Sequence, residues 1–332
     1  ALWFFLPIGA QTLMADGVDV AVTTSSGNLR YWQKPFESLA IGGCYVSLTR
    51  SGNMLELWGS SGSVVLRGER LGELTHVEPT GITDDLINDV FDLSEPTGLS
   101  TDRKSQRFST SLFAGVGYVT LVGVTIGYSP GSVPMNPALL VSKDGREGTW
   151  KYLGKLKGEP DDELLRGRKM IWSDCGSIVR LSGGTWRIYL TGFGPPGRTL
   201  VALESDTLEG PWRFFRSSDG SILDLLAGQY PHKGSCFPNL VMVSDEEWHV
   251  WISNQWPPSE IWHFYSKNGK DFRRYGEQPE ILRENIKCLR VFYDPKEKIL
   301  HGLLSVWEEK EDWWILHHST MNSGLGNLTL KD

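Results

Sequence analysis

A repeat of about 62 residues, a composition rich in tryptophan and glycine, and paired turn residues predict an all-β protein. The predicted fold is a five-bladed β-propeller whose blades are four-stranded antiparallel sheets. In the clearest pair of repeats, Trp186 matches Trp248 at a spacing of 62 residues, and Ser205 matches Ser266 at a spacing of 61. Repeats of this length are typical of propeller blades and of solenoid arrays.

Short turn motifs mark weaker copies of the same repeat. The run SKDG at 142–145 precedes Trp150, much as SKNG at 266–269 precedes Phe272. Asp-Gly and Asn-Gly pairs accept positive φ and favour tight hairpins. These copies therefore predict tight hairpins at matching places in the repeats.

The composition limits the function classes. The chain has 332 residues with 14 Trp and 37 Gly, and we expect a single propeller domain over residues 1–332. A net charge of −7 argues against nucleic acid as a partner, because phosphate binding needs a basic surface. No apolar run is long enough to span a membrane.

The first residues allow two interpretations. Leu2–Ile8 resembles the apolar part of a signal peptide, but no basic segment precedes it, so we expect a strand. We expect residues 1–36 to close the ring by pairing with the last blade, or to form part of a sixth blade, which is the alternative blade count. The sequence leaves the compartment open, secreted or cytoplasmic.

The repeat assigns strands to each blade, because one blade cannot bury both of its faces and must stack on its neighbours. The innermost strands are predicted to begin near Cys44, Ser109, Cys175, Cys236 and Cys288. The second strands are predicted at Asn53–Trp58, Gly117–Thr125, Trp186–Thr191, Trp248–Ser253 and Ile299–Val306.

All four cysteines fall at predicted starts of inner strands and would therefore surround the axis. Cysteine is small and readily buried, so we interpret these residues as packing residues. A disulfide or a thiolate metal site is the alternative. No Cys-x-x-Cys spacing supports a metal, and we predict neither a metal nor a cofactor.

The fold also predicts which residues share a pocket. In a four-stranded blade, the loop that precedes strand one and the hairpin between strands two and three lie on the same face. The preceding loops supply Arg107, Asp174, His232, Lys233 and Lys287, and the hairpins supply Tyr128, Trp256, Glu260, Glu308 and Glu309. Acids, bases and aromatic rings on one rim suit a carbohydrate, whose apolar faces stack on rings.

Each candidate has a plainer reading beside the functional one. Asp174 is the preferred catalytic carboxylate, although Asp before a strand is also a common hydrogen-bonded turn residue. His232 lies in a loop, where a surface histidine is the default. Trp256 is a stacking platform for sugar or a rigid loop tip, and Glu260 is by default a solvated charge at the start of a strand.

Three further motifs are informative, namely SDTLEGPW at 205–212, SKDG at 142–145 and SKNGKDF at 266–272. They resemble the hairpins that close blades in five-bladed propeller glycosidases, which include the arabinanase and β-xylosidase group and the related invertase and levansucrase group. The resemblance covers roughly residues 105–320. The resemblance implies a glycoside hydrolase with three carboxylates at the starts of inner strands. These would be an Asp base, an Asp that orients and tunes, and a Glu acid.

The chain matches that pattern in part. Asp174 resembles the tuning Asp, but Cys236 stands where the Glu acid is implied, which leaves His232 or Glu260 as candidates for the acid. Asp16 or Asp19 could be the base only if the N-terminal segment is the true first blade.

We therefore predict a glycoside hydrolase acting on a poly- or oligosaccharide through carboxylates in the axial pocket. Two alternatives remain. One is a non-catalytic carbohydrate-binding propeller that uses Trp256, Tyr128 and the charged rim. The other is a protein-interaction propeller with a flat, aromatic-rich face.

Overall fold

The computed structural model describes residues 11–15, 18–23, 47–58, 64–70, 74, 76–82, 106–113, 117–124, 138–158, 171–194, 197–231, 237–254, 260–282, 286–308 and 313–322. Within these residues all regular elements are β-strands, and the paired strands of every sheet run antiparallel. None of these ranges contains a helix that could cross a membrane. The prediction of an all-β antiparallel protein is confirmed.

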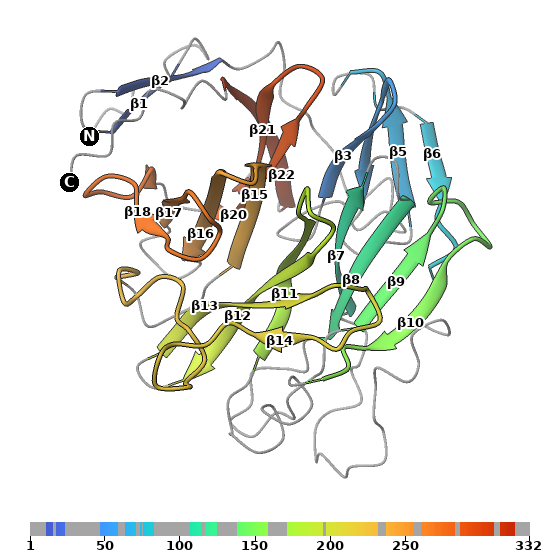
Figure 1. Ribbon diagram of the computed structural model, residues 1–332. Helices are drawn as coiled ribbons and strands as arrows, with labels where there is room; N and C mark the ends of the chain where they lie inside the picture. Colours follow the sequence, from blue (N-terminus) through green and yellow to red (C-terminus); the bar gives the residue numbers. More distant parts are fainter. Residues whose placement is uncertain are drawn as a thin grey trace.

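The strands form five sheets (Figure 1). The first contains β3 (Ser47–Ser51), β4 (Met54–Trp58), β5 (Val64–Gly68) and β6 (His76–Pro79). The second contains β7 (Gln106–Phe113), β8 (Gly117–Val124), β9 (Ala138–Ser142) and β10 (Lys151–Lys155). The third contains β11 (Ile171–Arg180), β12 (Trp186–Gly194), β13 (Gly197–Ser205) and β14 (Arg213–Phe214).

The remaining two sheets have five strands each. The fourth contains β15 (Phe237–Ser244), β16 (Glu247–Asn254), β17 (Glu260–Ser266), β18 (Arg273–Arg274) and β19 (Ile281–Leu282). The fifth contains β20 (Ile286–Asp294), β21 (Ile299–Glu308) and β22 (Trp313–Asn322), and it also takes β1 (Gln11–Ala15) and β2 (Val18–Thr23).

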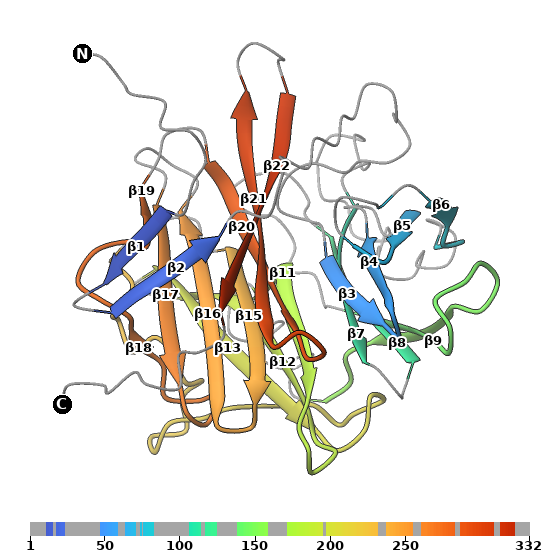
Figure 2. The same cartoon turned by 90° about the horizontal axis from the view of Figure 1, so that it is seen from above.

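The fifth sheet joins the two ends of the chain. Its strand order is β1-β2-β22-β21-β20, and β2 pairs with β22 through Val22–Met321 and Thr23–Thr320 (Figures 1 and 2). The N-terminal hairpin therefore supplies the outer strands of this sheet.

The inner strands are β3, β7, β11, β15 and β20. Together they form a closed cycle. In order, β3 contacts β7, β7 contacts β11, β11 contacts β15, β15 contacts β20, and β20 contacts β3. Figure 1 shows the sheets arranged around one central axis. This is the architecture of a β-propeller.

The hydrophobic core lies between the faces of neighbouring sheets. Tyr189 and Leu200 of the third sheet pack with Trp248, Val250 and Phe264 of the fourth. A second cluster joins the second and third sheets, and a third joins the fourth and fifth. The third and fourth sheets therefore bury both of their faces against neighbouring sheets.

The sequence repeat corresponds to one sheet of this ring. Ser142, Ser205 and Ser266 each end the third strand of a sheet. The Ser142 hydroxyl accepts the Gly145 N–H at 2.8 Å, and the Ser266 hydroxyl accepts the Gly269 N–H at 3.0 Å. The repeated serine is thus the residue that closes the turn after strand three.

The five predicted second strands are confirmed to within three residues at their ends. The predicted starts of inner strands were less accurate. Cys175 and Cys288 lie inside β11 and β20, four and two residues after the first residue of the strand. Cys44 and Cys236 lie outside the described residues.

Candidate functional site

The inner strand β11 is interrupted where it carries the predicted catalytic carboxylate, Asp174. Trp172 pairs with Thr191, but the next paired residue, Ser177, faces Tyr189. Residues 173–176 therefore stand opposite a single residue of β12. Bulges of this kind re-aim side chains and are over-represented next to active sites.

Gly176 explains how this bulge fits between two sheets. A Cβ atom at Gly176 would lie 2.4 Å from Cδ2 of Leu121 and 2.6 Å from Cδ2 of Leu190, and both leucines are fully buried. A side chain at this position would force both leucine side chains to shift within the core. Glycine therefore allows the bulge to pack closely against the second and third sheets.

A second irregularity lies in β20. Ile286 pairs with Val306 and Cys288 pairs with Ser305, so Lys287 is an extra residue. Lys287 and Asp174 were both predicted as site residues. Their strands are interrupted near the end at which each strand begins.

Glu260 is the one predicted site residue whose side-chain contacts the structure describes. It is the first residue of β17, and its carboxylate accepts a hydrogen bond from the Trp262 indole at 2.9 Å. It lies at the end of the sheet where β15 begins, but two strands farther from the axis. Its proposed role as the acid stays a prediction.

For the remaining predicted residues the structure describes either the backbone position alone or nothing. Arg107 is the second residue of β7, and Asp19 lies in β2. Because β1 and β2 are the outer strands of the fifth sheet, the described part of the N-terminal segment, residues 11–15 and 18–23, is not an inner strand. The role of Asp16 or Asp19 as the base stays a prediction. Asp16, Tyr128, His232, Lys233 and Trp256 lie outside the described residues.

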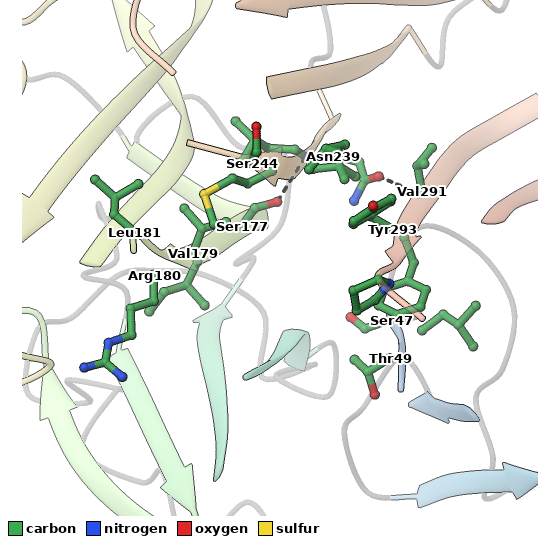
Figure 3. A pocket seen from close by; sticks show the side chains of 18 of the residues that line it. Ser47, Thr49, Ser177, Val179, Arg180, Leu181, Asn239, Ser244, Val291 and Tyr293 are labelled. Carbon is green, nitrogen blue, oxygen red and sulfur yellow. Dashed lines mark hydrogen bonds between the residues drawn. The ribbon is translucent and has the colours of Figure 1, made fainter. Parts of the chain in front are cut away.

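An axial cavity of about 1000 Å³ lies between the inner strands (Figure 3). Its walls are formed by β3, by β11 from Gly176 onward, by β15 from Asn239 onward and by β20 from Arg290 onward. It also reaches the hairpin residues Ser182, Asp245 and Pro295 that follow these strands. The cavity therefore opens at the ends of the inner strands, opposite the end predicted to carry the catalytic residues.

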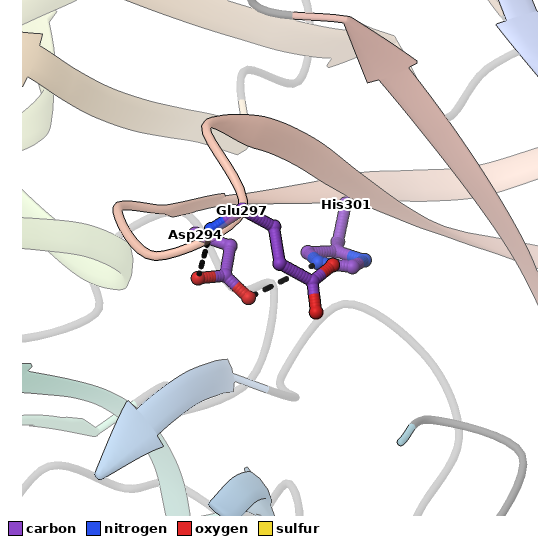
Figure 4. Close-up of side chains that lie close together, drawn as sticks. All are labelled: Asp294, Glu297 and His301. Carbon is purple, nitrogen blue, oxygen red and sulfur yellow. Dashed lines mark hydrogen bonds and ion pairs between the residues drawn. The ribbon is translucent and has the colours of Figure 1, made fainter. Parts of the chain in front are cut away.

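The cluster of Asp294, Glu297 and His301 was not predicted from the sequence, and its ligand atoms lie within 4.8 Å of one another (Figure 4). Arg50 already supplies the positive charge there, because its guanidinium donates to Asp294 at 2.6 Å and pairs with Glu297 at 3.2 Å. Burial alone would raise the pKa of Asp294, but the hydrogen bond from Arg50 and backbone N–H groups hold this pKa below its usual value. We interpret the cluster as an ion-paired contact between sheets.

Two buried histidines and two partly buried glutamates form a chain across the fourth sheet that was also not predicted. His249 Nδ1 lies 2.9 Å from His263 Nε2, His249 Nε2 lies 3.2 Å from Glu247, and His263 Nδ1 lies 3.2 Å from Glu280. The Trp251 indole donates to Glu280 at 2.8 Å. Burial lowers the pKa of His249. Burial alone would raise the pKa of Glu280, but His263 and the hydrogen bond from Trp251 bring this pKa below its usual value.

No known family model matches the chain, and no curated protein sequence matches it either. Solved structures do match. A thermostable family-43 glycoside hydrolase has a TM-score of 0.53 at 14% identity, over 85% of this chain and 88% of that one. The α-L-arabinanase of Cellvibrio cellulosa, complexed with arabinohexaose, has a TM-score of 0.53 at 11% identity, over 85% of this chain and 91% of that one.

A third similar structure is the α-L-arabinofuranosidase of Podospora anserina in complex with cellotriose. Its TM-score is 0.54 at 10% identity, over 89% of this chain and 95% of that one. The predicted resemblance to propeller glycosidases is confirmed as a likeness of fold. At these low sequence identities the similarity supports the fold alone, and function has to be argued from the site.

Proposed function

We propose that this protein is a glycoside hydrolase whose active site lies where the inner strands begin. The bulge at residues 173–176 of β11 carries this proposal, because it sets Asp174 apart from the regular strand at that end. The extra residue Lys287 in β20 lies near the same end of the ring. The fold shared with arabinanases and an arabinofuranosidase supports the same conclusion by analogy.

The proposed architecture is a single propeller of five blades over residues 1–332. The closed cycle of the five inner strands supports this count. Three sheets have four strands, and the others add β19 or the N-terminal hairpin to the blade. In this arrangement the starts of β11, β15 and β20 face one mouth of the axis.

The proposed chemistry is hydrolysis of a glycosidic bond that lies between two carboxyl groups of the protein. Asp174 supplies one carboxylate that stabilises the positive charge developing on the sugar and orients the acid. The acid comes from a neighbouring inner strand or hairpin, with His232 and Glu260 as the candidates. Arabinose-containing polysaccharides are the first substrates to test, because two of the structural neighbours are named for arabinosyl linkages.

The test is hydrolysis by the wild-type chain and by Asp174→Asn. Linear and branched arabinan, xylan and a panel of aryl glycosides serve as substrates. We expect Asp174→Asn to lower kcat/KM by about 10²- to 10⁴-fold, the range found for groups that assist proton transfer. Asp206→Asn is a matched control, because Asp206 is an exposed residue of the turn after β13.

Two results would overturn the proposal. Hydrolysis that is equal in wild type and Asp174→Asn would remove Asp174 from the mechanism. Binding of these glycans without any turnover would instead support a non-catalytic carbohydrate-binding propeller.

A further inference from the structure

The axial cavity opens away from the proposed hydrolytic site. The cavity is lined by the later residues of β11, β15 and β20 and by the hairpins after them. Asp174 and Lys287 lie toward the starts of the same strands. The two ends of the axis therefore present different residues, and the cavity belongs to the end that the proposed hydrolysis does not use.

Some hydrogen-bond donors on the cavity wall are not used in the contacts between neighbouring sheets. The Ser177 hydroxyl accepts the Leu240 N–H at 3.2 Å, and Asn239 Oδ1 accepts the N–H of Val291. These contacts use acceptor oxygens, so the Ser177 hydroxyl hydrogen and the Asn239 amide hydrogens remain as donors. Among the described residues, Nδ2 of Asn239 has no hydrogen-bond partner. Figure 3 shows Ser177, Asn239 and Tyr293 coming from three different inner strands around the same opening.

Apolar and aromatic surface lies beside these donors. Tyr293 and Phe292 of β20 and Met242 of β15 line the cavity and are half-buried. Because aromatic rings lie next to hydroxyl and amide groups, the cavity wall can contact a ligand through both an apolar and a polar surface. This combination suits a molecule that itself has apolar faces and a hydroxyl edge.

The charges on the wall balance. Arg180 and Arg290 line the cavity together with the exposed carboxylates of Asp245 and Glu246. The charge of Arg50 is already compensated by Asp294. With two cations against two anions, no excess charge favours a phosphate, a polyanion or a metal ion.

We propose that the axial cavity is a binding site for a neutral oligosaccharide, separate from the site of hydrolysis. Sugar hydroxyls accept from Asn239 and Ser177, and an apolar sugar face packs on the ring of Tyr293. A volume of about 1000 Å³ holds several sugar units and lies at the upper end of the range for ligand pockets. The proposal does not depend on hydrolysis, because none of these residues is assigned to it.

The experiment measures binding by calorimetry in the full-length Asp174→Asn chain, so that turnover does not consume the probe. The probes are linear hexasaccharides of glucose, xylose and arabinose, with hexagalacturonate as a charged probe. Asn239→Asp is the central variant, because a carboxylate can still accept the Val291 N–H but cannot donate to a sugar. Asn53→Asp is the matched control, since Asn53 is exposed in the turn after β3 and does not line the cavity.

We expect at least one neutral hexasaccharide to bind, and Asn239→Asp to weaken that binding at least tenfold while Asn53→Asp leaves it unchanged. Ser244→Trp provides a second test, because Ser244 is exposed at the cavity wall and a large side chain there would block the opening. Failure of every neutral probe to bind, or binding that neither cavity variant weakens, would overturn the proposal. A preference for hexagalacturonate would overturn it as well. Hydrolysis is judged from Asp174 alone, so failure of one proposal leaves the other standing.

Discussion

The Arg50 guanidinium donates to the Asp294 carboxylate at 2.6 Å across the junction of the first and fifth sheets. The two residues are 244 positions apart in the sequence, and their side chains are 5% and 0% exposed. Arg50 comes from β3 and Asp294 ends β20, so this ion pair joins the first and last inner strands of the ring. The pairing of β2 with β22 links the chain ends separately, within the fifth sheet itself.

Removing the carboxylate from this pair should destabilise the ring. Asp294→Asn leaves a buried guanidinium with a weaker partner, and breaking a buried ion pair costs about 3–5 kcal/mol. We expect the free energy of unfolding in urea to fall by about 3 kcal/mol, because Glu297 still contacts Arg50. Glu297→Gln is the control, since its exposed carboxylate pairs with the same arginine and should change stability by no more than about 1 kcal/mol. Equal losses in the two variants would contradict this assignment.

The blade repeat could be predicted from the sequence because it depends on local signals. Trp186, Trp248 and the serines that end third strands recur at nearly constant spacing, and the hydroxyls of Ser142 and Ser266 accept hydrogen bonds within their own turns. The glycines at 145 and 269 adopt positive φ in the turns that the Asp-Gly and Asn-Gly pairs predicted. Local chemistry of this kind is readable without knowing the neighbouring blades.

The contacts between blades could not be predicted in the same way. Gly176 of the bulge packs against Leu121, which comes from a different sheet, and Arg50 meets Asp294 across the junction of the first and last sheets. His249 and His263 are not direct cross-strand partners, because His249 faces Tyr265 in the register of β16 and β17. No spacing in the sequence marks such diagonal or long-range contacts.

The buried histidine chain predicts how stability depends on pH. Because burial lowers the pKa of His249, the unfolded chain takes up a proton near pH 6.5 that the folded chain binds only at lower pH. His263 and the carboxylates of Glu247 and Glu280 face this group. The free energy of unfolding should therefore fall as the pH drops through 6.5.

Urea unfolding between pH 7.5 and pH 5 tests this dependence in wild type and in His249→Gln. We expect the variant to have a shallower slope, by up to about 1.4 kcal/mol per pH unit, the value for one proton. Tyr265→Phe serves as a control, because its ring lies 5.4 Å from His249 but does not titrate in this range. Parallel pH profiles for wild type and His249→Gln would rule out His249 as the source.

The turn at Gly269 predicts a difference between two glycine substitutions. Gly269 has φ of +69°, and a Cβ atom there would lie 2.6 Å from the Tyr189 hydroxyl of the third sheet. Gly52 has φ of +60° with no atom within 4 Å of the added Cβ. Gly52→Ala therefore carries only the backbone cost of about 1–2 kcal/mol, whereas Gly269→Ala adds an overpacking cost of about 1–3 kcal/mol. Thermal and urea unfolding should rank them in this order, and the reverse order would contradict the contact.

Gly176→Ala tests whether the β11 bulge positions the active site. An added methyl group would meet the buried methyl groups of Leu121 and Leu190, so we expect a loss of about 1–3 kcal/mol in the free energy of unfolding. Displacing the bulge should also move Asp174, and a shift of about 1 Å can cost roughly 10²-fold in rate.

Gly183→Ala is the matched control, because its added Cβ atom meets nothing within 4 Å and it lies in the hairpin that follows the same strand. This variant should stay within about 0.5 kcal/mol of wild type and keep its activity. Hydrolysis is measured at a temperature where both variants are fully folded, so that stability does not enter the rate. If Gly176→Ala hydrolysed as fast as Gly183→Ala under those conditions, the bulge would be a packing feature without a part in catalysis. A selective loss in Gly176→Ala would place the reacting groups at the starts of the inner strands.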